Sequence, residues 1–197
     1  FYRQPSVAHW NLFCLGQALL PLIEDQDIAV AALETYPPLF AKALLQRFSA
    51  KLGLPNGTLA PNALVEDLLT LLASEAVDYS IFWRLLGHWL AHQEDAPVLD
   101  LFRSRDGIQG WLAAFAELHR AASRAEAAQR MLANNPRYVL RNHLGELAIR
   151  AAGNKDFSLV ATLLKVLQSP YAEQPEHAGL ADFPPAWAAG IEISCSS

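Results

Sequence analysis

The chain has 197 residues, of which 52% are hydrophobic and 18% charged, with a formal net charge of −5 and a pI near 5.6. This mild acidity argues against a nucleic-acid backbone as the main partner, because such a partner needs a basic face. Two cysteines do not make a disulfide framework, and no uninterrupted apolar run reaches the roughly 20 residues that span a bilayer. We therefore expect a soluble, cytoplasmic protein with one sizeable core and with neither a nucleic-acid nor a membrane partner.

The amino-terminal residues indicate that the chain is part of a longer protein. The first residue is Phe1, and the only methionine is Met131. The first residues also lack the basic stretch and apolar run of a secretory signal. We expect further protein before Phe1.

Apolar residues recur at helical spacing almost throughout, and no alternating run bounded by turns indicates a strand. The pattern predicts an all-α fold. In chain order the expected helices cover 6–23, 27–52 with a bend at Pro37-Pro38, 62–74, 79–93, 96–104, and 108–131 with a break near Ser123. A turn is expected at Pro55-Asn56-Gly57.

A further helix is predicted to start at Asn135, with the asparagine as its cap and Pro136 in the first helical position. Its expected buried stripe consists of Leu140, Leu144, Leu147, Ala148 and Ala151. Gly153 is expected to end it, and Asp156 to cap a short final helix that stops at Ser169-Pro170. The expected core face of that final helix is Phe157, Val160, Leu163, Leu164 and Leu167.

From Pro170 onward the sequence changes character, because prolines recur and aromatic residues stand at Tyr171 and Trp187. This composition favours an irregular strap lying over the helices. We divide the chain into a helical domain, 1–169, and a carboxyl-terminal strap with its tail, 170–197.

Two patterns resemble binding motifs without their chemistry. Gly107 and Gly110 lie between expected helices without basic neighbours, and we interpret them as a turn. His88 and His92 have the i, i+4 spacing of a zinc-binding pair, but no glutamate follows His88 as a metalloprotease helix requires. We favour a surface pair, and we assign no catalytic, cofactor-binding or metal-binding residue.

Charged residues near the carboxyl end leave two interpretations open. Arg137 and Arg141, expected on one helix face, either bind a phosphate or an acidic patch on a partner, or pair within the fold with Glu146 or another carboxylate. We favour the internal pairs. A second group, Glu173 with Glu176 and His177, resembles an acid and base cluster, but no nucleophile lies nearby in the sequence, so we favour structural hydrogen bonding there.

Cys195 lies close to the carboxyl end, where a packed core is not expected to hold it. An exposed tail cysteine can form, exchange or break a disulfide, so this residue is our candidate redox site. The alternative is an inert tail thiol, and position alone does not separate the two.

Several ordered motifs resemble the carboxyl-terminal part of the selenoprotein O family, called YdiU in bacteria. They are Gln4-Pro5, Trp10-Asn11-Leu12, Lys51-Leu52-Gly53-Leu54, Asp78-Tyr79 with Phe82 and Arg84, Asn135 to Asn142, Leu164-Lys165-Val166-Leu167, Pro170-Tyr171, Gln174-Pro175-Glu176-His177, and Ser194-Cys195-Ser196-Ser197. The resemblance covers essentially the whole chain. Trp83 and Ala172 depart from it, where phenylalanine and aspartate are expected.

This resemblance implies a protein-kinase-like enzyme that transfers AMP from ATP, with magnesium or manganese, to hydroxyl side chains of proteins. It implies that the glycine-rich loop, the lysine and the metal-binding residues precede this segment, so the chain alone is expected to be inactive. The helices would complete the C-lobe of the kinase-like fold, with the missing N-terminal domain and the protein substrates as partners.

The resemblance also places Cys195 at the family's terminal selenocysteine or cysteine position, which favours the redox interpretation. It implies a partner cysteine upstream of this segment, and Cys14 does not match that position. The alternative function is a non-catalytic helical interaction module whose apolar face docks on a partner.

Overall fold

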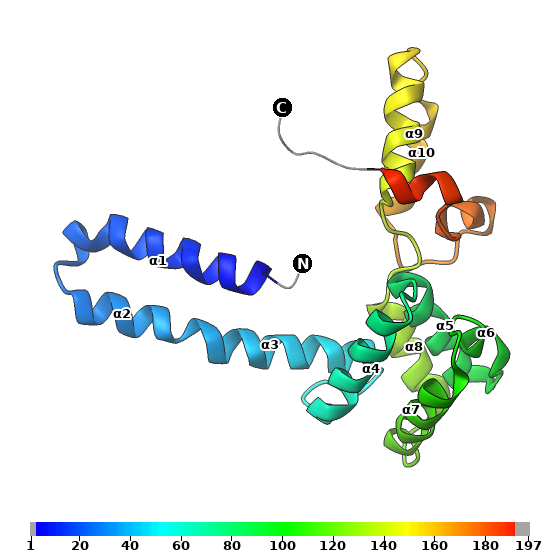
Figure 1. The fold of residues 1–197 in the computed structure, drawn as a ribbon, viewed down its shortest axis with the longest axis horizontal. Helices are drawn as coiled ribbons and strands as arrows, with labels where there is room; N and C mark the ends of the chain where they lie inside the picture. Colours follow the sequence, from blue (N-terminus) through cyan, green and yellow to red (C-terminus); the bar gives the residue numbers. More distant parts are fainter. Residues whose placement is uncertain (1–2, 192–197) are drawn as a thin grey trace.

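A computed structural model describes residues 3–191, and within this range every regular element is a helix (Figure 1). The α-helices are α1 (Gln4–Ile23), α2 (Gln26–Glu34), α3 (Tyr36–Lys51), α4 (Asn62–Ser74), α5 (Tyr79–His92), α6 (Ala96–Leu99), α7 (Arg105–Leu118), α8 (Arg124–Asn134), α9 (Asn142–Gly153) and α10 (Ser158–Leu167). Two 3₁₀ helices follow, η1 (Pro175–Ala181) and η2 (Ala186–Gly190). The all-α prediction is confirmed for the described residues. The place of these helices in a kinase C-lobe and the domain division both stay predictions.

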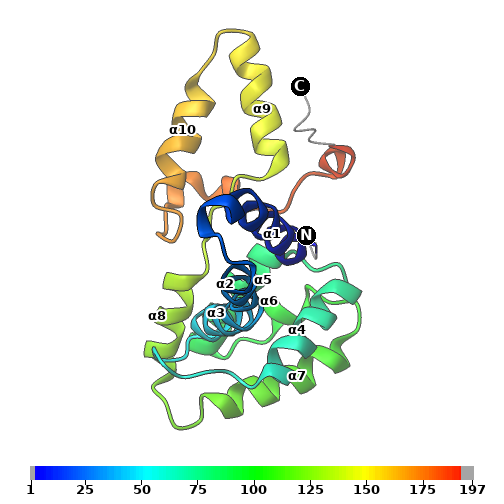
Figure 2. The same ribbon diagram turned by 90° about the vertical axis from the view of Figure 1, so that its left-hand side faces the viewer.

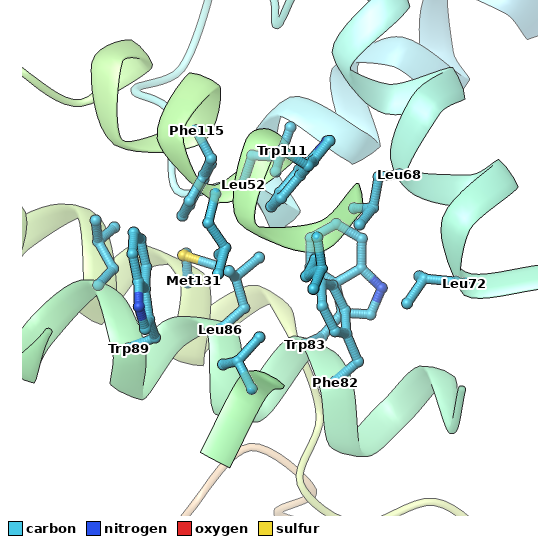
Figure 3. Packing of buried hydrophobic residues seen from close by; sticks show 14 of the residues in the cluster. Leu52, Leu68, Leu72, Phe82, Trp83, Leu86, Trp89, Trp111, Phe115 and Met131 are labelled. Carbon is cyan, nitrogen blue, oxygen red and sulfur yellow. The ribbon is translucent and has the colours of Figure 1, made fainter. Parts of the chain in front are cut away.

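The main core is formed by side chains from the end of α3 through α8, and several of its aromatic rings pack edge to face (Figure 3). Phe82 of α5 is fully buried and contacts the rings of Trp83, Phe102 and Trp111. Complete burial of such a side chain contributes about 1.5 to 3 kcal/mol. Apolar side chains from α3 to α8 thus fix one compact body, which we call the core.

Gly53, in the loop after α3, shows how tightly the core packs. Its φ of +79° is one that residues with a Cβ rarely adopt. A Cβ here would lie 2.5 Å from the carbonyl oxygen of Ala127 and 2.7 Å from the side chain of Met131, both on α8. The missing side chain therefore allows the loop to lie directly against α8.

Helices α1 and α2 form an arm with the first part of α3, and this arm extends away from the core (Figure 1). Helix α1 lies alongside α2 and α3, tied by the Tyr36 hydroxyl, which donates to the carbonyl oxygen of Pro5 at 3.2 Å. His9 stacks on the same tyrosine ring. No residue of α1 or α2 is buried. The expected bend falls at Thr35, where α2 gives way to α3 just before Pro37-Pro38.

The arm is apolar although it is exposed. By length and composition alone, Gln4–Ile23 and the stretch Gln26–Lys51 could each cross a membrane. The sequence did not predict this, because neither stretch is an uninterrupted apolar run. This finding rests on length and composition alone and does not assign the arm to a bilayer. What it establishes is two long helices whose apolar side chains are largely uncovered.

Helices α9 and α10 pack against each other as a second, smaller unit beside the core (Figure 2). Leu144, Ala148 and Leu163 form its buried centre, and Leu180 of η1 packs on them. Other residues of the predicted stripes lie elsewhere: Leu140, Leu147, Phe157, Val160 and Leu164 are exposed. The predicted faces are wrong at these positions because only the side facing the partner helix is covered.

Candidate functional site: a polar junction between the two helical units

A cluster of charged and amide side chains lies where the core meets the α9–α10 unit. Residues 135–141 cross between the two units, and residues 170–174 run beside them. We call the cluster the polar junction; its members are Lys51, Asp78, Arg84, Asn135, Arg137, Arg141 and Glu173.

Asn135 is the fully buried centre of the junction. Its side-chain amide donates to the carbonyl oxygens of Lys51 (2.9 Å) and Met131 (2.8 Å), and its Oδ1 accepts from Lys51 Nζ at 2.6 Å. The predicted cap of a following helix is therefore wrong, because the side chain joins α3 to the end of α8. The next helix begins at Asn142 instead.

The segment after Asn135 is extended because its amides bind the strap. The backbone N–H groups of Arg137 and Tyr138 both donate to the carbonyl oxygen of Pro170, at 2.8 and 3.1 Å. The Tyr138 hydroxyl donates to the carbonyl oxygen of Gln174 at 2.8 Å. These tertiary hydrogen bonds satisfy the groups that a helix would otherwise satisfy.

Lys51 stands at the aromatic edge of the junction. Its Nζ lies 4.6 Å from the ring centroid of Trp83 and 5.1 Å from that of Tyr79. Such placement over ring faces stabilises a cation. Burial nevertheless lowers the pKa of Lys51 to about 8. At neutral pH the side chain is still mostly protonated.

Arg84 projects from α5 into the junction and is largely buried. Its Nη1 donates to the carbonyl oxygens of Leu132 (3.0 Å), Asn135 (3.1 Å) and Tyr171 (3.3 Å), and its Nη2 donates to the carboxylate of Glu173. Burial lowers the pKa of Arg84, whereas the charge of Glu173 raises it, and arginine stays cationic. One guanidinium thus joins the core, the crossing segment and the strap.

The arginines singled out in the sequence pair within the fold, as favoured. Arg137 donates to Glu173, and Arg141 forms a two-pronged pair with Asp78 at 2.6 and 3.0 Å. Glu146 is not their partner, because it pairs with Arg150 at 2.7 Å. The expectation of one shared helix face is wrong, since both arginines precede α9.

Asp78 has two structural roles. Its carboxylate accepts the backbone N–H of Ile81 at 3.0 Å, which caps α5, while it also pairs with Arg141. Burial alone would raise the pKa of Asp78, but the hydrogen bonds from Arg141 and Ile81, together with the charge of Arg141, lower it below its usual value. The Asp78 carboxylate is therefore ionised, and both Arg141 and the Ile81 N–H bind it.

The remaining candidates do not converge on a site. The His88 and His92 rings stack at 6.4 Å, and within residues 3–191 no group of three or more His, Cys, Asp or Glu side chains is placed to hold a metal. Glu176 lies 3.9 Å from His177, away from the pairs of Glu173. Structural bonding at Glu173 is confirmed.

The predicted turn at Gly107 and Gly110 is wrong, because both residues lie in the first turns of α7. The physical reason is packing: a Cβ on Gly107 would lie 2.9 Å from the side chain of Leu71 on α4. Gly107 therefore lets α7 approach α4, whereas a Cβ on Gly110 would meet no atom within 4 Å.

The candidate redox residue, Cys195, lies outside the described residues, so the redox prediction stays untested. Cys14 lies in α1 and is partly buried. Its pairing with Cys195 likewise falls outside the part of the chain that the structure describes.

Comparison with known proteins decides the family. The family model described as "Protein adenylyltransferase SelO" matches residues 1–168. The chain belongs to the SelO family. This confirms the resemblance drawn from the sequence motifs.

Individual SelO relatives extend the match to every residue. The chain is 55% identical to the protein nucleotidyltransferase YdiU of Variovorax paradoxus, 50% to that of Albidiferax ferrireducens and 44% to that of Burkholderia multivorans. In each case all of the chain is covered, but only about 40% of the relative's length. The chain thus corresponds to a part of a SelO protein.

The polar junction does not fit the magnesium that the SelO family implies. Magnesium needs free carboxylate oxygens in near-octahedral arrangement. Here Asp78 is occupied by Arg141, and Glu173 by Arg84 and Arg137. The described residues therefore offer a structural joint, and we derive no catalytic step through it.

Sequence reasoning missed the junction as a unit. The sequence marks Lys51, Asp78 and Arg84 only as members of the motifs shared with the SelO family, and it marks Asn135 also as a predicted helix cap. The signal that could have found them is the presence of charged residues inside otherwise apolar helices, since buried charges are normally paired.

Proposed function

We propose that this chain is the carboxyl-terminal helical region of a protein adenylyltransferase that transfers AMP from ATP to hydroxyl side chains of proteins. The observation that carries this proposal is the SelO family match over residues 1–168, with relatives matching the full chain. The nucleotide and the divalent metal would be held by the other 60% or so of a full-length relative, the complement of the 40% matched here.

The role proposed for this region is to support that catalytic part. The arm carries a groove of about 750 Å³ between α1 and the α2–α3 stretch. Leu12, Leu15 and Leu19 line it from α1, and Val30, Leu33 and Leu39 from α2 and α3. Exposed apolar surface of this kind is typical of a docking face.

The arm also favours the alternative function, a non-catalytic helical module that docks on another protein. The two proposals differ in the occupant of the arm: the rest of the same polypeptide in the first, and a separate protein in the second. The proposed redox role of Cys195 belongs to the first, because it needs a partner cysteine in the catalytic part.

AMP transfer from labelled ATP to a generic protein substrate tests the proposal. Three proteins are compared, each with and without reductant: the full-length protein, the 197-residue chain, and the full-length Cys195→Ser variant. We expect transfer only by the longer forms, with a reductant effect in the wild type that the variant lacks. Cys14→Ser in the full-length protein is the matched control and should behave as wild type.

Other results of the AMP-transfer assay would contradict one or more parts of the proposal. Transfer by the chain alone would contradict the placement of the catalytic residues outside it. No transfer by any form would favour the interaction module. An identical reductant effect in wild type and Cys195→Ser would remove the redox role and leave the transferase proposal intact.

A further inference from the structure

Two guanidinium groups in the polar junction converge on one carboxylate that is open to solvent. Arg84 Nη2 contacts one oxygen of Glu173, and Arg137 Nη1 contacts the other. The side chain of Glu173 is 50% exposed, whereas that of Arg84 is only 8% exposed. The cations are thus more firmly embedded than their anion.

The junction has more positive charge than its carboxylates neutralise. Arg141 is balanced by Asp78. Arg84 and Arg137 share the single carboxylate of Glu173. Lys51 binds the side-chain oxygen of Asn135 and adds a third positive charge to the junction without a carboxylate of its own. In addition, the buried Nε atoms of Arg84 and Arg137 have no hydrogen-bond partner among the described residues. Such a surplus of donors and charge suits a multivalent oxyanion.

Arg84 is held in place without help from Glu173, and the Arg137 guanidinium keeps a contact with the Tyr138 ring, whose centroid lies 5.8 Å from Arg137 Cζ. Three backbone carbonyl oxygens fix Arg84 Nη1. The strap is anchored on either side of Glu173, at the carbonyl oxygens of Pro170 and Gln174. Removing the Glu173 carboxylate therefore vacates the space between the arginines and leaves the surrounding contacts intact.

We propose that Arg84 and Arg137 form an oxyanion clamp in which Glu173 is the resident ligand, and that a phosphate ion can take its place. A phosphate carries more charge and more acceptor oxygens than one carboxylate, and guanidinium groups bind such oxygens in pairs. Because the resident carboxylate is tethered, it competes as a ligand of high effective concentration. The clamp is therefore weak toward phosphate in the wild type and strong once Glu173 is neutralised.

Phosphate titration of the full-length protein tests the clamp, with sodium chloride at matched ionic strength as the reference. Binding is followed by isothermal titration calorimetry in wild type, Glu173→Gln, and Glu173→Gln combined with Arg137→Gln. We expect saturable binding in Glu173→Gln at least about tenfold tighter than in wild type. The double variant measures phosphate bound elsewhere and should lose this component.

Hydrogen exchange of residues 171–177 in the wild type reports directly whether phosphate displaces Glu173 from the arginines. Saturating phosphate should speed exchange there, and Arg137→Gln should abolish that response. If Glu173→Gln fails to fold, Glu173→Asp, whose shorter carboxylate reaches the arginines less well, replaces it and should also bind phosphate more tightly. No Arg137-dependent phosphate binding in the glutamate variants would overturn the clamp. Phosphate binding in those variants, with no change in hydrogen exchange of the wild-type strap, would contradict the replacement of Glu173 by phosphate in the wild type.

Discussion

The core and the arm are both built from apolar helices, yet only the core buries them. Phe82 in α5 is completely buried among three aromatic rings, whereas Phe13 in α1 is 45% exposed. The difference lies in what covers each face. The core supplies its own cover from α3 to α8, while the arm offers an apolar groove that residues 3–191 leave open. An apolar helical pattern thus predicts a face to be covered, without predicting what covers it.

Truncation of a phenylalanine should give the largest difference in stability between the core and the arm. Phe82→Ala removes a fully packed ring, and we expect a loss of about 3 to 5 kcal/mol in the free energy of unfolding. Phe13→Ala in the isolated chain should cost less than about 1 kcal/mol, because its ring keeps much of its water contact. Urea unfolding measures both. Equal losses would contradict the contrast between core and arm.

Two glycine substitutions, one next to the core and one in the arm, should also differ in their effect on stability. Gly53→Ala places a Cβ against α8 at a positive φ, so we expect a loss of roughly 2 to 4 kcal/mol from strain and overpacking together. Gly16→Ala in α1 meets no atom within 4 Å and should leave stability unchanged or slightly increase it. The midpoints of thermal unfolding should move in opposite directions, or only Gly53→Ala should move.

The Asp78–Arg141 pair predicts an acid-sensitive joint between the two units. Asp78→Asn should cost about 3 kcal/mol at neutral pH, since it leaves Arg141 buried without its charge partner. Because the folded-state pKa of Asp78 lies below 3.8, its value in the unfolded chain, this stabilisation is complete above that value. It is lost as pH falls through the folded pKa.

Wild type and Asp78→Asn should accordingly converge in unfolding free energy at low pH. Asp67→Asn, on the outer face of α4, is the matched control and should run parallel to wild type. A constant gap between wild type and Asp78→Asn down to pH 2 would show that the charge of Asp78 contributes nothing.

Lys51 gives the smallest expected effect, and burial of its charge opposes folding, whereas the paired charge of Asp78 stabilises the fold. The folded-state pKa of Lys51, about 8, is below its ordinary value of 10.5, so between these values the unfolded chain binds more protons. Stability therefore rises with pH across this window. Lys51→Gln keeps a donor for Asn135 and should flatten the rise between pH 7.5 and 9.5, as measured by melting temperature. Lys42→Gln, in the arm, should leave it unchanged.

The sequence predicts the helices well wherever the signal is local. The bend before Pro37-Pro38 follows from the missing amide donors, and the break at Ser123 from its cap, whose hydroxyl accepts the N–H of Glu126. Local signals fail at Asn135. Its side chain and the amides after it are used by α3, α8 and the strap, which lie far away in sequence.

The candidate site shows the same limit. Internal pairing of Arg137 and Arg141 is confirmed, although the shared helix face from which it was predicted is wrong, and their partners could not be predicted. Glu173 lies 36 residues after Arg137, and Asp78 lies 63 residues before Arg141. Pairing over such separations is decided by how the two helical units meet.

Hydrogen exchange of the arm tests the central claim, that its apolar face is covered by the rest of a SelO protein. Exchange in residues 4–34 is compared between the 197-residue chain and the full-length protein, with the core helix α5 as the internal reference. We predict that the arm exchanges at least about tenfold more slowly in the full-length protein while α5 changes little. Equal arm exchange in both proteins would contradict the claim and would assign the groove to a separate partner.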